Sequence, residues 1–76
     1  MVDGNTVQVG AWVEVQDGRL RDGWRIVRAE EADVRRRWLS EESPLGRALL
    51  GHVAGDQVQV DGPSGRRTVT IIEVAR

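Results

Sequence analysis

The chain has 76 residues, of which 39% are hydrophobic and 30% are charged, and its formal net charge is -1. This length allows one compact domain over residues 1–76 with a small core. The absence of cysteine excludes disulfides and thiolate metal sites, and one histidine cannot build a histidine-rich metal site. The nearly neutral charge argues against a dedicated nucleic-acid binder.

The first residues carry no targeting signal. Met1–Asn5 lack the basic stretch and the apolar core of a secretory leader. Apolar runs such as Ala48-Leu49-Leu50 are far shorter than the ~20 residues that span a bilayer. The arginines are scattered rather than gathered on one amphipathic face. We therefore expect a cytoplasmic protein that does not bind a membrane.

Alternating apolar and polar residues predict four strands. These strands span Val7–Gly10 with Ala11–Val15, then Trp24–Arg28, Gln57–Val60 and Thr68–Val74. Gly10 marks a bend in the first strand. Gln16–Gly23 contains two Asp-Gly pairs and is predicted to be the loop of a hairpin, and Asp61–Gly65 is predicted to be a second hairpin turn.

Ser43–Gly51 carries the clearest helix signal. Ser43 is a preferred N-cap, and Pro44 fits the first helical position. The apolar residues on one face of this helix are Leu45, Ala48 and Leu49. Gly51 can end the helix in the left-handed conformation. Gly46 lowers the helix propensity by about 1 kcal/mol relative to alanine, so the helix must dock on the sheet to persist.

Ala29–Arg37, between the second strand and the helix, is rich in charge and can form one or two helical turns. It has little to bury besides Val34, so we expect a short surface connection. Trp38 and Leu39 follow it as apolar anchors. The order strand, strand, helix, strand, strand predicts an α+β fold, an antiparallel sheet with one helix on its face.

Side chains suited to catalysis or metal binding are few. The two carboxylate clusters are Glu30-Glu31-Asp33 and Glu41-Glu42. Both could bind Mg²⁺ in principle, but they lie in short polar connections among arginines, which favours a solvated surface. His52 is best explained by the dipole at the helix end, and Ser43 by capping rather than nucleophilic attack. We expect no metal, no cofactor and no enzymatic activity.

Two further features have both a structural and a binding interpretation. The run Arg35–Arg37 could contact phosphates, but the flanking acidic residues compensate it and favour a solvated or protein-facing surface. Trp12, Trp24 and Trp38 could form a platform for stacking bases. In a small chain without Phe or Tyr, however, core packing is the more common use of tryptophan.

Several motifs follow one another in a recognisable order. They are Trp24-Arg25-Ile26-Val27, Glu30-Glu31-Ala32-Asp33, Leu39-Ser40, Ser43-Pro44-Leu45-Gly46-Arg47-Ala48-Leu49-Leu50-Gly51, Gly55-Asp56 and Gly62-Pro63-Ser64-Gly65. This order resembles the C-terminal domain of the GreA/GreB transcript cleavage factor family over nearly the whole chain. The Ser-Pro helix and the preceding Glu-Ala-Asp are the specific part. The resemblance implies an FKBP-like fold, a curved antiparallel β-sheet with one short helix.

The resemblance also implies a function. In that family this domain docks on bacterial RNA polymerase at the secondary-channel entrance, against the coiled-coil rim of the largest subunit. The residues expected to bind this partner are Glu42, Ser43 and Pro44, which match the family motif, and their neighbours Leu45, Arg47 and Ala48. We therefore expect the RNA polymerase-binding domain of a Gre-like factor that regulates transcription elongation, with no sequence-specific contact to nucleic acid.

Departures from the family pattern leave other functions open. No heptad segment for the family's acidic-tipped N-terminal coiled coil is present, so no catalytic residue carries over. Gly46 stands where the family usually has alanine. One alternative is an FKBP-like peptidyl-prolyl isomerase, which the lack of Phe and Tyr disfavours because that activity needs an aromatic pocket. Another is a small nucleic-acid-binding β module, which would bind in a salt-sensitive manner.

Overall fold

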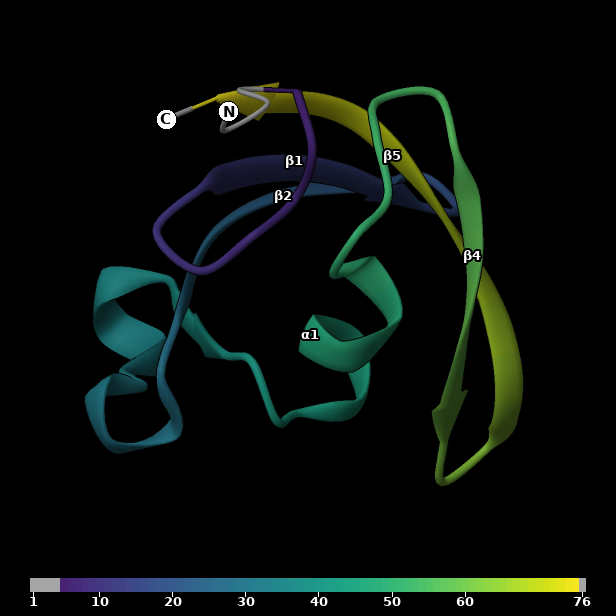
Figure 1. Ribbon diagram of the computed structural model, residues 1–76. Helices are drawn as coiled ribbons and strands as arrows, with labels where there is room; N and C mark the ends of the chain where they lie inside the picture. Colours follow the sequence, from purple (N-terminus) through teal and green to yellow (C-terminus); the bar gives the residue numbers. More distant parts are fainter. Residues whose placement is uncertain (1–4, 76) are drawn as a thin grey trace.

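The computed structural model describes residues 5–75, which form five strands, one α-helix and two single-turn 3₁₀ helices (Figure 1). In chain order they are β1 (Trp12–Asp17), β2 (Leu20–Val27), η1 (Ala29–Glu31), η2 (Val34–Arg36), β3 (Trp38–Ser40), α1 (Pro44–Leu49), β4 (Gln57–Gly62) and β5 (Gly65–Ala75). None of the helices in this range has the length and apolar composition needed to cross a bilayer.

The five strands form one sheet in the order β3-β2-β1-β5-β4. Figure 1 shows that the sheet curls into a half-barrel around α1. The predicted α+β class, with a curved sheet and one short helix, is confirmed. One pairing departs from the antiparallel pattern, because β3 lies parallel to β2. The chain passes through η1 and η2 before it returns beside β2. Because of this crossover, β3 runs in the same direction as β2, whereas the second strand of a hairpin would run in the opposite direction.

The core lies between the concave face of the sheet and α1. Alternate residues of the strands point inward, as the sequence pattern predicts. The fully buried residues of this core are Val7, Val13, Val15, Ile26, Leu49, Val58, Val60, Val69 and Ile71. Leu49, with no exposed surface, is the residue that α1 contributes to this buried set, while Leu45 and Ala48 pack beside it half-buried. The short helix is therefore held by the sheet and not by its own propensity.

The hairpin between β1 and β2 is tighter than predicted. Its turn is formed by Gly18 and Arg19, while the second Asp-Gly pair lies inside β2. Gly23 lies under the indole ring of Trp12, and a Cβ at this position would overlap the ring. Gly23 therefore serves a close side-chain approach on the outer face of the sheet and does not form a turn.

The three tryptophans are half-buried and none belongs to the buried core. Trp24 packs against the core from β2, in agreement with a packing role. Trp12 lies on the outer face of β1, and Trp38 begins β3, a strand that the sequence pattern does not predict.

Candidate functional site at the start of helix α1

A compact hydrogen-bond network holds the chain that enters α1. The Ser43 hydroxyl accepts from the Gly46 amide at 3.0 Å and donates to the Ser40 carbonyl at 2.8 Å. The Ser43 amide donates to the same carbonyl at 3.1 Å, and the Glu42 amide donates to the Ser40 hydroxyl at 3.0 Å. The predicted N-cap at Ser43 and Pro44 at the first helical position are confirmed. The Glu42–Pro44 segment is thus anchored on both sides.

Gly46 permits this close approach. It is buried in the first turn of α1, and a Cβ there would overlap the Ser40 carbonyl oxygen and lie 3.0 Å from the Ser43 hydroxyl oxygen. In this chain, glycine at this position therefore allows the preceding loop to pack closely against α1, which a helix-propensity scale does not take into account.

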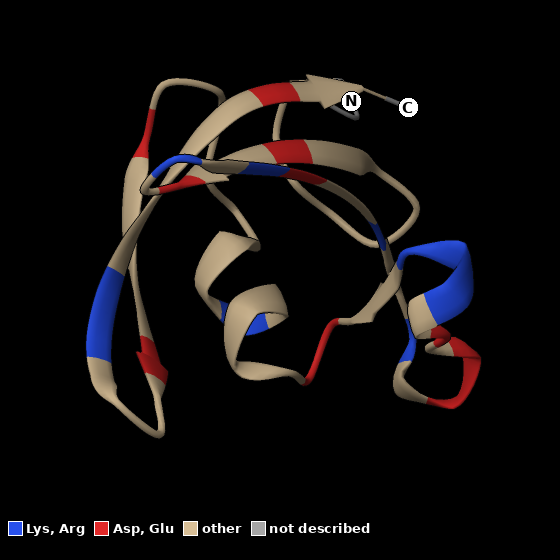
Figure 2. Ribbon diagram, turned by 180° about the vertical axis from the view of Figure 1, so that it is seen from behind, with Lys and Arg blue, Asp and Glu red and all other residues tan. Residues whose placement is uncertain are grey.

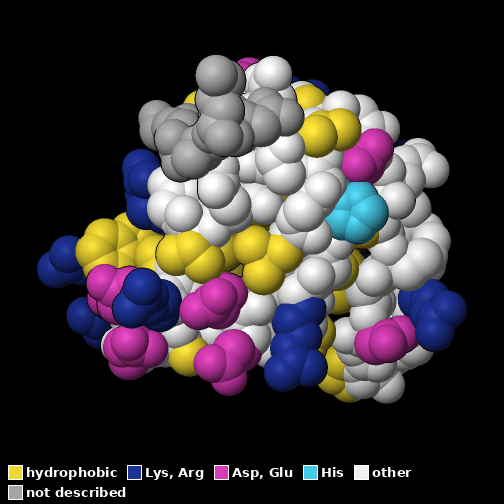
Figure 3. All heavy atoms as spheres, viewed as in Figure 1, with side chains coloured by type: hydrophobic (Ala, Val, Ile, Leu, Met, Phe, Trp, Pro, Cys, Tyr) yellow, Lys and Arg dark blue, Asp and Glu magenta, His cyan; other side chains and the backbone are white. Residues whose placement is uncertain are grey.

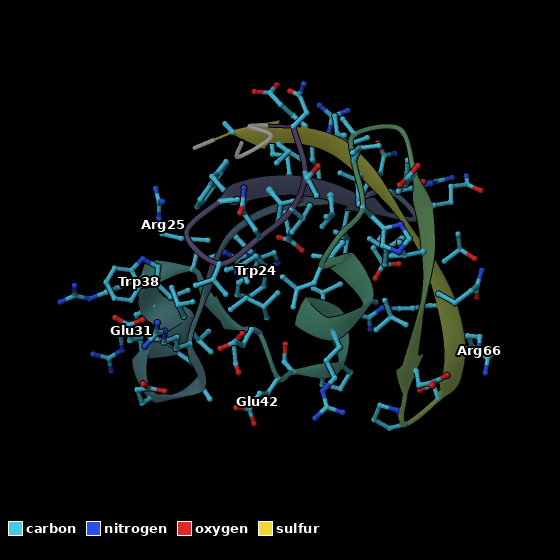
Figure 4. All side chains as sticks on the ribbon, viewed as in Figure 1. Trp24, Arg25, Glu31, Trp38, Glu42 and Arg66 are labelled. Atoms are coloured by element: carbon cyan, nitrogen blue, oxygen red, sulfur yellow. The ribbon has the colours of Figure 1, made fainter. Side chains whose placement is uncertain are left out.

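Four of the six predicted site residues gather on one depression of about 420 Å³ beside α1. These are Glu42, Pro44, Arg47 and Ala48, and the opposite wall is formed by Gln59 and Asp61 of β4. Neither Glu42 nor Arg47 forms an ion pair with any residue of the described range 5–75. An exposed carboxylate, an exposed guanidinium and an apolar Pro-Ala surface thus lie together, and Figure 4 shows Glu42 on the segment that leads into α1.

The other two predicted residues lie differently. Leu45 is half-buried and packs against the core, and the Ser43 hydroxyl is occupied by Ser40 and Gly46. Leu45 and Ser43 therefore hold the neighbouring exposed residues in place and do not line the depression themselves. Gln59 and Asp61 carry no sequence signal that assigns them to this surface, because only the packing of β4 beside α1 brings them there. Alternation along β4 indicates polar exposure and nothing more.

A second depression lies on the other side of Ser43, and we call it the tryptophan groove. It has a volume of about 260 Å³ and is lined by Trp24, Ala32, Asp33, Val34, Trp38, Leu39, Ser40 and Ser43. The Arg37 guanidinium lies 3.8 Å from the centre of the Trp24 ring, and that of Arg36 lies 5.1 Å from the centre of the Trp38 ring. These cation–π contacts hold both indoles in place.

Two arginines of the run Arg35–Arg37 form contacts within the fold. Arg37 donates to the Asp22 carboxylate at 2.8 Å and to the Gly23 carbonyl at 3.2 Å, and Arg36 lies 3.6 Å from the Asp33 carboxylate. Figure 2 shows basic and acidic residues side by side in this connection. Asp33 also caps η2 by accepting from the Arg35 amide at 3.0 Å. No group of three His, Asp or Glu residues within the described range is arranged to hold a metal ion.

His52 follows α1 and contacts Asp56 as well as the helix end. Its Nδ1 lies 3.1 Å from the Asp56 carboxylate, whose same oxygen accepts from the Val53 amide at 3.0 Å. The Val53 N–H, followed by the His52 ring, holds the pKa of the Asp56 carboxyl below its ordinary value. This arrangement closes the loop between α1 and β4, at the opposite end of α1 from Ser43.

Comparison with known proteins agrees with this geometry. The family model described as "Transcription elongation factor, GreA/GreB, C-term" matches residues 2–76. The chain is 44% identical to transcription elongation factor GreA of Thermomicrobium roseum, over 95% of this chain and 46% of that protein. It is 38% identical to transcription elongation factor GreB of Yersinia pestis, over 86% of this chain and 39% of that protein.

Solved structures give the same result. The crystal structure of GreA factor homolog 1 of Thermus thermophilus superposes with a TM-score of 0.79 at 32% identity, covering 96% of this chain and 50% of that one. The chain therefore spans about half the length of the relatives that it matches. The chain belongs to the GreA/GreB transcription elongation factor family, and it corresponds to the C-terminal domain of that family.

Proposed function

We propose that this chain is an RNA polymerase-binding domain that docks at the secondary-channel entrance, against the coiled-coil rim of the largest subunit, and so regulates transcription elongation. The proposal implies a cytoplasmic location and a protein partner. Membership of the GreA/GreB family supports it, because the matched relatives are named as transcription elongation factors. The match favours neither a prolyl isomerase nor a nucleic-acid-binding module.

The observation that carries the proposal is the rigid, exposed surface at the start of α1. Glu42, Pro44 and Arg47 are exposed on one depression, and within residues 5–75 neither Glu42 nor Arg47 forms an ion pair. The Ser40–Ser43 hydrogen bonds fix the backbone beneath them. The backbone of such a surface loses little conformational entropy when a partner binds, so less of the binding free energy is spent on ordering it.

We assign two roles to the residues of this surface. Glu42, Pro44, Arg47 and Ala48 contact the polymerase directly, with Glu42 and Arg47 selecting a partner of complementary charge. Ser43 and Leu45 hold the contact residues in place through the cap and the core. Gln59 and Asp61 of β4 form the far edge of the same contact.

Binding of the labelled chain to purified RNA polymerase core enzyme tests this assignment. We expect Glu42→Arg to weaken binding by about tenfold or more, because it reverses the charge at the centre of the surface. Pro44→Ala removes a smaller apolar contact, and we expect it to weaken binding by a few-fold. Both residues are exposed, so circular dichroism should show folded variants.

Glu73→Arg provides the matched control for charge reversal. Glu73 is exposed on β5 and pairs across the sheet with Glu14, on the face opposite to the core. The control variant should bind like the wild type. Wild-type affinity in both Glu42→Arg and Pro44→Ala would refute the proposed contact surface, and a wild-type chain that does not bind the polymerase would refute the function itself.

A further inference from the structure

The strand β4 is a free edge of the sheet. Within residues 5–75, the strand order places β5 on one side of β4 and no strand on the other, as Figure 1 shows at the right of the half-barrel. The opposite edge strand, β3, has three residues and packs against η1 and η2, whereas β4 has six residues and pairs with β5 without a register shift. A free edge of this length is a template for pairing with another chain.

The hydrogen bonds between β4 and β5 determine which backbone groups of β4 point outward. The Ile71 amide donates to the Asp56 carbonyl at 2.8 Å, one position before the paired residues of β4 begin. In an antiparallel ladder, hydrogen-bonded pairs alternate with pairs that exchange no bond. Val58 and Val60 therefore bond to β5, and the N–H and C=O groups of the residues between and beside them point away from it. These outward-pointing residues are Gln57, Gln59 and Asp61, whose backbone bonds to no other element of the described range.

The side chains of β4 leave this edge open. Gln57 and Gln59 are exposed on the outer face, while Val58 and Val60 are buried against the core. Lysine, proline and bulges commonly block free edges, and β4 contains none of them. Figure 3 shows largely uncharged surface at the right of the molecule, where β4 lies in Figure 1. On the side of α1, Gln59 and Asp61 line a depression, so the helix does not cover the edge there.

Two copies of β4 are complementary when they pair antiparallel about Gln59. Gln57 then lies opposite Asp61 of the second copy, and every outward-pointing residue faces another such residue. About six backbone hydrogen bonds result. Moving the centre by one residue places an outward-pointing residue opposite Gly55 or Pro63, which lie outside β4. Pairing about Gln59 is therefore the register that uses the whole edge.

The side chains agree with this register. Val58 lies opposite Val60 of the second copy, which extends the apolar face of the sheet. On the outer face, Asp61 meets the uncharged Gln57, whereas pairing about Asp61 would set two like charges opposite each other. The net charge of the chain is only -1, so long-range repulsion between two copies is small.

We propose that this chain forms a two-fold symmetric homodimer in which β4 pairs antiparallel with β4 of a second copy. This inference goes beyond the proposed function and does not depend on it. One strand edge is small beside the area of about 800 Å² per partner in a standard interface, so we expect a dissociation constant between about 10 μM and 1 mM. Because Gln59 and Asp61 also line the depression at the start of α1, the dimer covers part of the proposed docking surface.

Sedimentation equilibrium of the wild type and of Gln59→Pro tests the dimer. The substitution removes the N–H at the centre of the pair, which does not bond to β5, and edge strands tolerate proline. We expect Gln59→Pro to weaken association at least about tenfold, and circular dichroism should show a folded variant. A wild-type chain that stays monomeric at about 1 mM, or a folded Gln59→Pro variant that associates like the wild type, overturns the proposal.

Gln57→Arg and Gln59→Arg test the register and do not depend on the proline variant. Both replace an exposed glutamine on the same face of β4 by the same residue. At position 57 the arginine faces Asp61 of the second copy and should strengthen association several-fold, whereas at position 59 it faces itself and should weaken association several-fold. Added salt should reduce both effects. Effects of the same sign would overturn pairing about Gln59.

Amide hydrogen exchange followed by NMR tests whether a dimer uses this edge. The amides of Gln57, Gln59 and Asp61 should exchange more slowly as the protein concentration rises, because pairing protects them. Those of Val58 and Val60 bond to β5 and should exchange slowly even in the dilute monomer. A dimer in which the exchange of the three outward-pointing amides does not change with concentration uses another surface, and that result overturns the proposal.

Discussion

Gly46 sits in the first turn of α1 with its α-carbon against the Ser40 carbonyl. Propensity alone favours alanine here by about 1 kcal/mol. Overlap of the new Cβ with a backbone oxygen opposes this gain, and small-to-large changes in tight packing cost about 1–3 kcal/mol. We therefore expect Gly46→Ala to lower the free energy of unfolding by up to about 2 kcal/mol, as measured by urea denaturation.

Gly62→Ala is the matched control, because a Cβ at Gly62 would lie 3.6 Å from the Gly65 carbonyl oxygen, an ordinary van der Waals contact. This control should change stability by less than about 0.5 kcal/mol. Gly46→Ala should also weaken the proposed binding to RNA polymerase under conditions where the variant is fully folded, since the Glu42–Pro44 segment has to shift. A stabilised Gly46→Ala variant with unchanged binding would show that the loop adapts without cost.

At the scale of elements, Arg37 joins β3 to β2. Its guanidinium bonds Asp22 and Gly23 of β2 and stacks on Trp24, while its carbonyl accepts from the Arg25 amide at 2.8 Å. We expect Arg37→Ala to lower the free energy of unfolding by about 1–2 kcal/mol, because the stacking and the hydrogen bonds are lost together. Urea denaturation followed by tryptophan fluorescence measures the change.

Arg35→Ala, two residues away in the same run, is the control for Arg37→Ala. Arg35 is exposed and its side chain forms no ion pair within residues 5–75. The control should leave stability within about 0.5 kcal/mol of the wild type. Equal effects from the two variants would contradict the assignment of Arg37 as the link between β2 and β3.

An element could be predicted from the sequence where the residues that determine it are close to it in the chain. The start and end of α1 could be predicted because Ser43, Pro44 and Gly51 act on their own neighbours. The strand β3 could not, because three residues carry no periodic pattern and its partner β2 lies beyond two 3₁₀ turns. For the same reason, the sequence could show that Glu42, Pro44, Arg47 and Ala48 lie close together around the start of α1, but not that Gln59 and Asp61 of β4 lie beside them.

At the scale of the whole molecule, residues 51–56 join the parts of the half-barrel. The Val7 amide donates to the His52 carbonyl at 2.8 Å, and the Gly51 amide donates to the Val7 carbonyl at 2.9 Å. The Gly55 amide donates to the Ile71 carbonyl at 2.7 Å, and the Ile71 amide donates to the Asp56 carbonyl at 2.8 Å. This loop therefore connects the N-terminal segment, the end of α1 and β5. Its closure depends on the Asp56 side chain, which holds the Val53 amide and the His52 ring.

The pH dependence of stability follows from that loop. The Val53 N–H, and after it the His52 ring, lower the pKa of the Asp56 carboxyl from its ordinary value of 3.8. A carboxyl whose pKa is lowered on folding stabilises the fold above its unfolded pKa, and the stabilisation is lost as the pH falls through the folded pKa. The urea midpoint should therefore decrease between neutral pH and a pH below 3.8 by a larger amount in the wild type than in Asp56→Asn, because asparagine cannot ionise. An equal fall in both proteins would mean that Asp56 ionisation does not contribute to loop closure.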